Sequence, residues 1–313
     1  MVMNTKGSMR QKYVLMTAAY NEELHIEKTL RSMISQTLLP QRWVIVSDNS
    51  SDRTDEIIKQ YADRYGFIRF LRVTRPKGRS FRSKVLALHE GATLLEGATY
   101  DFVGNIDGDI SVGPEYFASL IACFEKNPEL GIAGGFVHEE TDGEFASRKV
   151  NSARNVPHAA QLVRRECYED IHGYAVLEYG GEDWYAQLCA RMNGWEVQAF
   201  PELNIFHHRH TGEGSHVLAN HIRLGRLDYS FGSDPVFEIL KCFGRLREKP
   251  YLLAALLRLG AFFWASLRGQ PKSVPDDVAA FLRNEQKLRL ASWFHLRRLK
   301  NLRVPAPPDA RLN

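Results

Sequence analysis

The sequence predicts an α/β protein with a mostly parallel sheet flanked by helices, followed by a helical C-terminal extension. Apolar, strand-like runs alternate with amphipathic runs through the first half of the chain, which is the order of a parallel sheet covered on both faces. The composition is that of a globular protein, with 44% hydrophobic and 25% charged residues and no repeat or low-complexity tract. At 313 residues, the chain can bury one large core, or one domain with a smaller appendage.

The chain opens with two strand–helix pairs. "YVLMTAA" at 13–19 is an unbroken apolar run, typical of a buried strand, and the amphipathic run at 22–36 predicts a helix. "WVIVS" at 43–47 predicts the second strand. The helix expected over 51–66 has Asp52 near its start, where a carboxylate can accept hydrogen bonds from free backbone N–H groups.

The alternation of strands and helices continues to about residue 137. The next elements are expected at 67–73 (strand), 79–97 (helix), 100–106 (strand), 114–126 (helix) and 131–137 (strand). Pro114 suits the first turn of its helix, because the N–H that proline lacks has no partner there. Ligands of such sheets bind beyond the carboxyl ends of the strands, which directs attention to the residues that follow each strand.

Cysteine usage and charge limit the class of protein further. The four cysteines show no CxxC spacing, which argues against a zinc ribbon or a disulfide framework and favours reduced thiols in a cytosolic protein. Residues 1–12 are basic, but the apolar run behind them is one short strand, so we expect no secretory signal. The net charge of +4 conceals an asymmetry: residues 241–303 carry 14 Lys and Arg against 4 Asp and Glu.

Polar residues follow three of the predicted strands, in "AAYNEE" (18–23), "SDNSSD" (47–52) and "DGD" (107–109). No GxGxxG or GxxxxGK[ST] sequence is present, so no glycine-rich loop is available to hold phosphates. A divalent cation, Mn²⁺ or Mg²⁺, held by Asp107 and Asp109 would serve instead, because hard oxygen ligands suit both ions. The alternative is a turn whose aspartates cap helix 114–126.

"AAYNEE", "VSDNSSDRT", "SKVLALHEGA", "DGD" and "GGEDWYAQLCARMNGW" follow one another in the order typical of one family of enzymes. Over about residues 12–210 the chain resembles the family 2 glycosyltransferases of GT-A fold. These enzymes transfer a sugar from a nucleotide-diphosphate donor. The resemblance implies a GT-A catalytic domain at 1–235, and leaves 236–313 as a basic, apolar helical region.

The resemblance also implies roles for individual residues. The donor-binding residues would be Ala19, Tyr20, Asn21, Glu22, Asp48, Arg79, Lys84, Asp107, Gly108, Asp109 and Arg209. Asp48 would accept a hydrogen bond from the nucleobase, whereas the alternative is a local Asx turn. Arg79 and Lys84 would attract the diphosphate, although basic runs of this kind are commonly just solvated.

Two further segments would complete the site by resemblance. Asp183, in "GGED", would be the catalytic base that takes the proton of the acceptor hydroxyl, with Glu182 next in line. The alternative role of this pair is to cap the helix that follows it. Asp109 would be the direct metal ligand beside Asp107, and either His208 or His210 would complete the coordination; a structural hydrogen bond is the alternative for each histidine.

Together these features predict an inverting, metal-dependent glycosyltransferase that uses a UDP-, GDP- or dTDP-linked sugar. The acceptor would be a glycan, or a glycan carried on a polyprenyl lipid, in surface polysaccharide assembly. A nucleotidyltransferase of related fold is one alternative. A non-enzymatic module that binds lipid or nucleic acid is another, but it leaves the carboxylate pairs at 107–109 and 182–183 unexplained, and we expect no nucleic-acid partner.

The apolar stretch at 251–267 bears on localisation. Its 17 residues are fewer than the ~20 needed to span a bilayer, and Arg258 lies near its centre. Basic residues mixed with Trp, Phe and Leu through the C-terminal region fit a helix lying in the headgroup layer of anionic lipid. We therefore expect a cytoplasmic protein, peripheral or monotopic on the inner face of the membrane. The alternative is that these helices pack on the catalytic domain.

Overall fold

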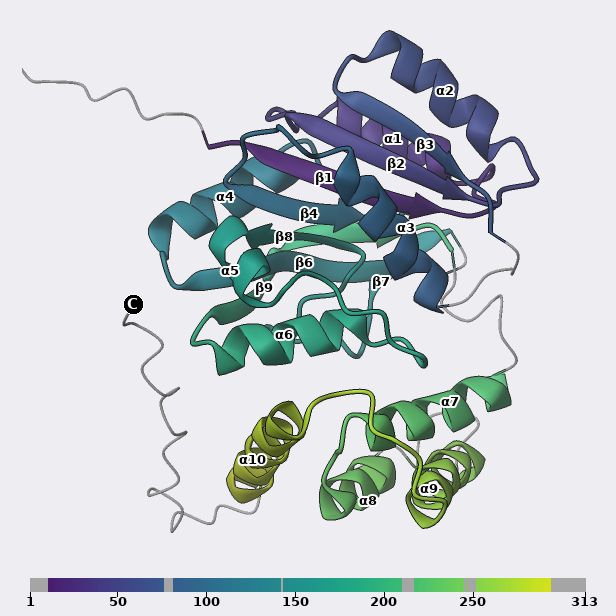
Figure 1. Ribbon diagram of the computed structural model, residues 1–313, viewed down its shortest axis with the longest axis vertical. Coiled ribbons are helices and arrows are strands. Elements are labelled where there is room, and N and C mark those ends of the chain that lie inside the picture. Colours follow the sequence, from purple (N-terminus) through teal and green to yellow (C-terminus); the bar gives the residue numbers. More distant parts are fainter. Residues whose placement is uncertain are drawn as a thin grey trace, which may run out of the picture. The chain divides into compact units, whose positions relative to one another are not determined.

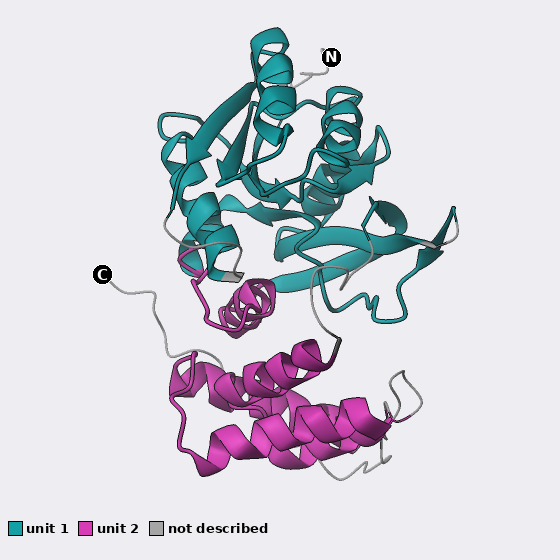
Figure 2. Ribbon diagram, turned by 90° about the vertical axis from the view of Figure 1, so that its right-hand side faces the viewer, with its two compact units in different colours: residues 1–170, 196–209 teal, residues 171–195, 210–313 magenta. Residues whose placement is uncertain are grey.

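The structure is a computed structural model, and it describes residues 11–75, 81–141, 143–209, 217–244, 246 and 252–293. The chain divides into two compact units (Figure 2). Unit 1 comprises residues 1–170 and 196–209 and contains the sheet, whereas unit 2 comprises residues 171–195 and 210–313, and its described regular elements are helices. The expected domain boundary near residue 235 stays a prediction.

One half of the sheet in unit 1 is parallel (Figure 1). Its strands lie in the order β3-β2-β1-β4, with bounds Ile68–Val73 (β3), Arg42–Asp48 (β2), Tyr13–Ala19 (β1) and Phe102–Ile106 (β4). Every strand of this half runs in the same direction, so all four carboxyl ends meet at one edge of the sheet.

The other half of the sheet is mixed. It consists of β8 (Ala160–Arg164), β6 (Leu130–Thr141), β9 (Glu196–His207), β5 (Ile110–Val112) and β7 (Glu144–Ser147). β8 joins it to the parallel half by pairing antiparallel with both β4 and β6. β9 lies parallel to β6 and antiparallel to β5, which brings the end of β9 beside the chain that leaves β4.

Helices cover both faces of the sheet. They are α1 (Ile26–Ile34), α2 (Thr54–Arg64), α3 (Phe81–Thr93), α4 (Tyr116–Lys126) and α5 (Arg165–Asp170). Leu15 belongs to the core formed with α1 and α4, whereas its neighbour Met16 lies on the opposite face, near Gly91 of α3. Successive strand residues thus enter two different apolar layers, which explains why these strands are apolar throughout instead of alternating.

The predicted fold class is confirmed, and the first strand matches the expectation residue for residue. β5, β7 and β8 were not predicted, and β6 is 12 residues long, well beyond the short strand expected at 131–137. β9 is also 12 residues long. The helix expected from residue 22 begins at Ile26, after a turn in which the carbonyl of Glu22 accepts hydrogen bonds from the N–H groups of His25 and Ile26.

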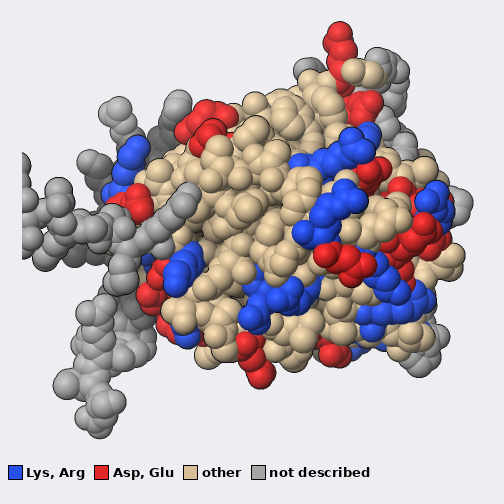
Figure 3. All heavy atoms as spheres, turned by 90° about the horizontal axis from the view of Figure 1, so that it is seen from above, with Lys and Arg blue, Asp and Glu red and all other residues tan. Residues whose placement is uncertain are grey.

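Two other helix boundaries also differ from the expectation. α4 begins at Tyr116, since the carbonyl of Pro114 accepts a hydrogen bond from the N–H of Thr37 in a loop contact. α3 ends at Thr93, and short backbone turns follow it up to Ala98. Figure 3 views the molecule from the top of Figure 1, the side on which α2 lies. Acidic and basic side chains are interspersed there, as is usual on a solvated surface.

Unit 2 consists of α6 (Glu182–Met192), α7 (Val217–Ser230), α8 (Pro235–Gly244), α9 (Leu252–Leu267) and α10 (Asp276–Trp293). α7 and α9 approach closely at Gly225, where a Cβ atom would lie 2.1 Å from the carbonyl oxygen of Arg258. α6 is joined to α10 by an ion pair between Arg191 and Glu285 at 2.8 Å. Among the described residues, no helix has the combination of length and apolar character needed to cross a bilayer.

Candidate active site

The loops after β1 and β2 are joined to each other at the edge where the parallel strands end. Ala19 is the buried last residue of β1, and Tyr20 after it is half-buried. Asn21 has a φ of 53°, which turns the chain back toward the second loop. Its N–H donates to Ser50 Oγ at 3.1 Å, and its Oδ1 accepts from the N–H of Ser51 at 2.8 Å. The two strand ends therefore form one rigid rim.

Asp48, the last residue of β2, has one carboxylate oxygen that accepts no hydrogen bond within the described part of the chain. Oδ2 accepts a hydrogen bond from Arg75 Nη1 at 2.8 Å. Oδ1 is buried and accepts no hydrogen bond from the described residues. Asn49 holds Arg75 in place through hydrogen bonds with its backbone. A buried carboxylate oxygen with spare acceptor capacity is suited to a ligand N–H group.

The two aspartates after β4 are paired with different cations. Asp107 is half-buried and lies 2.7 Å from Lys84 Nζ. Asp109 is buried, with His207 Nε2 at 3.3 Å and Arg209 Nε at 3.7 Å from its Oδ2 atom. Burial raises the pKa of Asp109, but the hydrogen bond and charge of His207 and the charges of Arg209 and Lys84 outweigh it, lowering the pKa to about 2. Asp109 is therefore ionised at neutral pH.

Arg209 connects this aspartate to the first strand. Its Nη2 atom forms an ion pair with Glu22, which is buried and whose N–H donates to Thr54 Oγ1. Gly108 fits closely between the aspartates, since a Cβ atom there would lie 3.3 Å from Glu22 Cγ. We call this group the carboxylate cluster; it consists of Glu22, Asp107 and Asp109 with Lys84, His207 and Arg209. Its members come from the ends of β1, β4 and β9 and from α3.

His207, which was not among the predicted metal ligands, is the histidine beside Asp109. Arg148 Nη2 lies 3.0 Å from its Nδ1 atom, and Arg148 Nε in turn donates to Glu139 Oε1 at 2.6 Å. His208 instead lies 2.8 Å from Ser111 Oγ through Nε2 and 3.4 Å from Lys28 Nζ through Nδ1. The assignment of metal ligands stays a prediction, and two predicted site residues, His210 and Arg79, lie outside the described residues.

The donor chemistry of the carboxylate cluster fits a divalent cation. Two carboxylates and an imidazole are ligands that Mn²⁺ accepts, and Mg²⁺ accepts the carboxylates. In the part of the chain that the structure describes, no three His, Cys, Asp or Glu side chains are arranged as a finished metal site. Lys84 and Arg209 instead neutralise the carboxylates that would bind the ion.

Glu182 and Asp183 belong to unit 2 and begin α6. Gly181 before them has a φ of 88°, a backbone conformation that favours glycine. Glu182 is buried near Arg223, whose pKa is lowered by burial while the Glu182 carboxylate opposes that shift. Asp183 is half-buried, and its Oδ1 accepts a hydrogen bond from the N–H of Trp184 at 2.8 Å.

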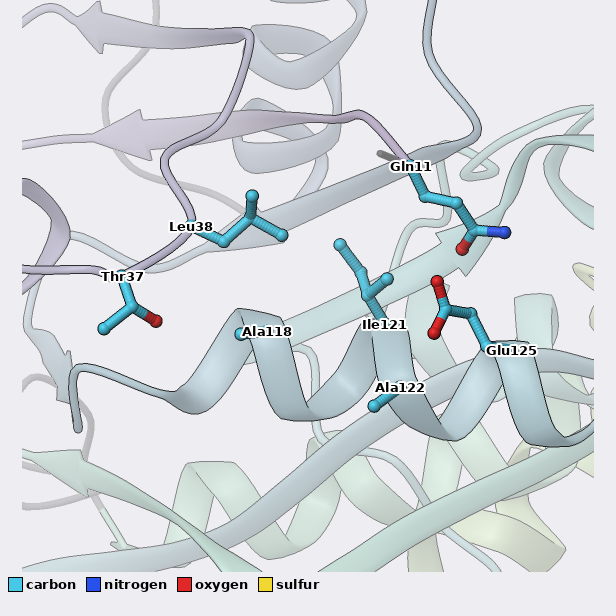
Figure 4. A pocket seen from close by; sticks show the side chains of 7 residues that line it. All are labelled: Gln11, Thr37, Leu38, Ala118, Ile121, Ala122 and Glu125. Atoms are coloured by element: carbon cyan, nitrogen blue, oxygen red, sulfur yellow. The ribbon is translucent and has the colours of Figure 1, made fainter. Parts of the chain in front are cut away.

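A pocket of about 490 Å³ opens at the other edge of the sheet, where β1 and β2 begin (Figure 4). Its lining residues are Gln11, Thr37, Leu38, Ala118, Ile121, Ala122 and Glu125. Gln11 and Glu125 point toward each other across it. None of the predicted site residues lines this pocket, so it is separate from the carboxylate cluster.

Comparison with known proteins identifies the family. Residues 15–178, more than half of the chain, match the sequence profile of glycosyl transferase family 2. The chain belongs to this family. The match spans the strand ends and every member of the carboxylate cluster except His207 and Arg209. It favours the glycosyltransferase expectation over a nucleotidyltransferase or a non-enzymatic binding module.

Proteins similar in sequence to this chain include two bacterial polysaccharide synthases. The chain is 32% identical over 118 residues to the poly-β-1,6-N-acetyl-D-glucosamine synthase of Staphylococcus epidermidis, which covers 38% of this chain. The corresponding enzyme of Staphylococcus aureus is 31% identical over the same length. The chain spans only 26%, about a quarter, of the length of each of these synthases.

Solved glycosyltransferases share the fold. A mannosyltransferase from Pyrobaculum calidifontis, in complex with GDP-mannose and Mn²⁺, superposes with a TM-score of 0.53 at 18% identity, over 92% of this chain and 83% of that one. TarS of Staphylococcus aureus in complex with UDP-GlcNAc gives a TM-score of 0.52 at 16% identity, over 91% and 88% of the two chains. The similarity to these structures confirms the GT-A fold expected of family 2.

Proposed function

We propose that this family 2 protein transfers a sugar from a nucleotide-diphosphate donor to an acceptor hydroxyl, with inversion at the anomeric carbon. The observation that carries the proposal is the arrangement at one edge of the sheet. There, Asp48 offers a buried carboxylate oxygen that has no hydrogen-bond partner among the described residues. The carboxylate cluster lies at the same edge, where β1, β4 and β9 end. Asp48 would bind the nucleobase through a ring N–H group, while the rim formed by Tyr20 and Asn21 would border the nucleoside.

The diphosphate would bind at the carboxylate cluster together with a divalent metal. Asp107, Asp109 and His207 would hold Mn²⁺ or Mg²⁺, because these residues supply the oxygen and nitrogen ligands that suit such ions. When bound, the metal supplies positive charge that stabilises the departing diphosphate. Lys84 lies beside Asp107, and Arg209 lies beside Asp109. Once these carboxylates hold the metal, both basic side chains would be free to bind the phosphate oxygens.

The acceptor hydroxyl needs a base. We assign this role to Asp183, with Glu182 as the alternative, because both are acidic residues at the start of α6 and Asp183 is the less buried of the two. The acceptor oxygen attacks the anomeric carbon from the side opposite the diphosphate and passes its proton to the carboxylate of Asp183. The new C–O bond forms as the bond to the diphosphate oxygen breaks, so one displacement inverts the configuration.

The donor would be linked to UDP, GDP or dTDP, and the acceptor would be a glycan or a polyprenyl-linked glycan at a membrane surface. Donor use is supported by the fold relatives, which were solved with GDP-mannose and with UDP-GlcNAc. The acceptor class is supported by the family relatives, which are named as synthases of a β-1,6-linked polysaccharide. The membrane surface is supported by the basic balance of residues 241–303.

Donor hydrolysis in the absence of acceptor tests this function directly. We expect slow, Mn²⁺-stimulated release of the nucleoside diphosphate from one class of UDP-, GDP- or dTDP-sugar, with NMR showing the inverted sugar as the first product. Asp109→Asn should abolish the metal stimulation, while Asp63→Asn, at an exposed position of α2, should leave it unchanged. Folded protein that neither binds nor hydrolyses any donor of the panel would refute the proposal.

A further inference from the structure

Helix α9 is apolar on two faces, and only one of them is packed inside unit 2. The packed face consists of Ala254, Ala255, Arg258, Phe262 and Ala265, all buried. The opposite face, which we call the α9 outer face, consists of Leu253, Leu256, Gly260, Phe263, Trp264 and Leu267. These residues recur every three or four positions, so they form one stripe along the helix. All are exposed, and the five with large side chains are between 37% and 83% exposed.

Buried charges fix which face of α9 points outward. Arg258 Nη2 lies 2.6 Å from Asp228 Oδ2 on α7, and Arg258 Nε lies 3.2 Å from Glu238 Oε1 on α8. Lys241 pairs with both carboxylates, at 3.0 Å from Asp228 in one case. Rotating α9 about its axis would leave these buried carboxylates without Arg258, which is costly. The α9 outer face is therefore held outward by the interior of unit 2.

The charges at the end of α9 indicate what the outer face contacts. Between Leu252 and Leu267 the sequence contains no acidic residue, and its only basic residue is the buried Arg258. Immediately after the helix, the Arg268 guanidinium lies over the Trp264 ring, 4.6 Å from its centroid. Trp and Arg side by side at the end of an apolar stripe are typical of a helix at the level of lipid headgroups, where the ring is half in the apolar layer.

The length of the stripe and the charge of the C-terminal sequence agree with a position at a membrane surface. From Leu253 to Leu267 the stripe runs about 21 Å at 1.5 Å per residue, long enough to lie in the plane of a membrane. Residues 241–303 carry 14 basic against 4 acidic residues, which attracts an anionic surface.

We propose that the α9 outer face inserts into the headgroup layer of an anionic membrane and holds the enzyme there, with α9 lying in the membrane plane. This proposal rests on the proposed function in one respect: the purpose of the attachment would be to bring the transferase to an acceptor at the membrane. The attachment itself depends on unit 2 alone.

Co-sedimentation of the full chain with vesicles tests the attachment. We expect binding to vesicles containing phosphatidylglycerol, weaker binding to pure phosphatidylcholine, and further weakening at high salt. The double variant Leu256→Gln and Leu267→Gln should lower the partition coefficient by at least about tenfold, or ~1.4 kcal/mol. Leu39→Gln, at an exposed leucine of unit 1, is the matched control and should bind like the wild type.

A second measurement follows Trp264 itself. Its emission should shift to the blue on addition of anionic vesicles, and Trp264→Phe should remove that shift while a thermal-unfolding scan shows intact folding. Equal binding of the double variant and the wild type would overturn the proposal, as would equal binding to both lipids. So would a dimer in gel filtration that the double variant dissociates without any vesicle binding. Donor hydrolysis is measured in parallel, so vesicle binding without hydrolysis rejects only the proposed function, and hydrolysis without vesicle binding rejects only the attachment.

Discussion

Replacement of Arg258 by leucine is expected to destabilise unit 2 strongly. Arg258 is 9% exposed and contacts two carboxylates, from Asp228 at 2.6 Å and from Glu238 at 3.2 Å. In Arg258→Leu, Lys241 is the remaining partner for both acids, so one buried negative charge is left uncompensated. Removing one partner of a buried pair costs about 3–5 kcal/mol. We expect a loss of free energy of unfolding in this range at pH 8.

The loss should be smaller at low pH. Burial and the neighbouring Asp228 raise the pKa of Glu238 to about 7. For an acid whose folded pKa is raised, the stabilising contribution is fully present below the unfolded pKa near 4.5 and is lost as the pH rises through about 7. At pH 5.5, Glu238 takes up a proton, so Arg258→Leu then leaves Asp228 paired with Lys241 and no excess charge. The same logic predicts that the double variant Arg258→Leu and Glu238→Gln regains roughly half of the loss at pH 8.

Urea unfolding of the full chain, followed by tryptophan fluorescence, measures these differences. Four of the five tryptophans lie in the sequence of unit 2, so the signal reports mainly on that unit. Arg289→Leu, at an exposed position of α10, is the control and should change the free energy of unfolding by less than about 0.5 kcal/mol. A loss below about 1 kcal/mol for Arg258→Leu at pH 8, or a double variant no more stable than the single one, would refute the reasoning.

Three further predictions concern unit 1 and the chemistry. His207→Ala should abolish Mn²⁺ stimulation of donor hydrolysis while His208→Ala keeps it, and the reverse result would restore the assignment made from sequence. Asp183→Asn should keep donor affinity, measured by calorimetry, but lower turnover by ~10²–10⁴-fold; near-normal turnover would move the base elsewhere. Gly104→Ala should abolish soluble expression, because its Cβ would lie 2.1 Å from the carbonyl oxygen of Gln161, whereas Gly66→Ala, with open space around it, should express normally.

The parallel half of the sheet could be predicted because its strands are buried on both faces. Such strands are continuous apolar runs separated by helices, and the run at 13–19 is β1 itself. β5 has two buried apolar residues, but at 3 residues it is too short to be recognised as a strand. β7 is 4 residues long and exposed throughout, so it carries no apolar signal. β8 is buried, but it pairs antiparallel with strands far from it in sequence, which local patterns do not reveal.

The same reasoning explains which residues of the candidate site could be placed at this edge from the sequence. Asp48, Asp107 and Asp109 could be predicted, since parallel strands bring their carboxyl ends to one edge wherever the strands are recognised. His207 could not, because its orientation depends on counting along β9. The pairing of β6 with β9 shifts register after Gly135, whose partner is Phe200, while Phe136 pairs with Asn204. A shift of this kind breaks the alternation by which successive side chains are assigned to faces.

The ion pairs of the carboxylate cluster bear on whether donor binding needs a metal. The ion pairs of the cluster and of its neighbours Glu139 and Arg148 involve Glu22, Asp107, Asp109, Glu139, Lys84, Arg148 and Arg209. In this arrangement Lys84 is paired with Asp107, and Arg209 is paired with Glu22 and lies close to Asp109. Both cations are therefore already held by carboxylates. A divalent cation bound by the carboxylates would free Lys84 and Arg209 for the phosphates, so we infer that donor binding depends on metal.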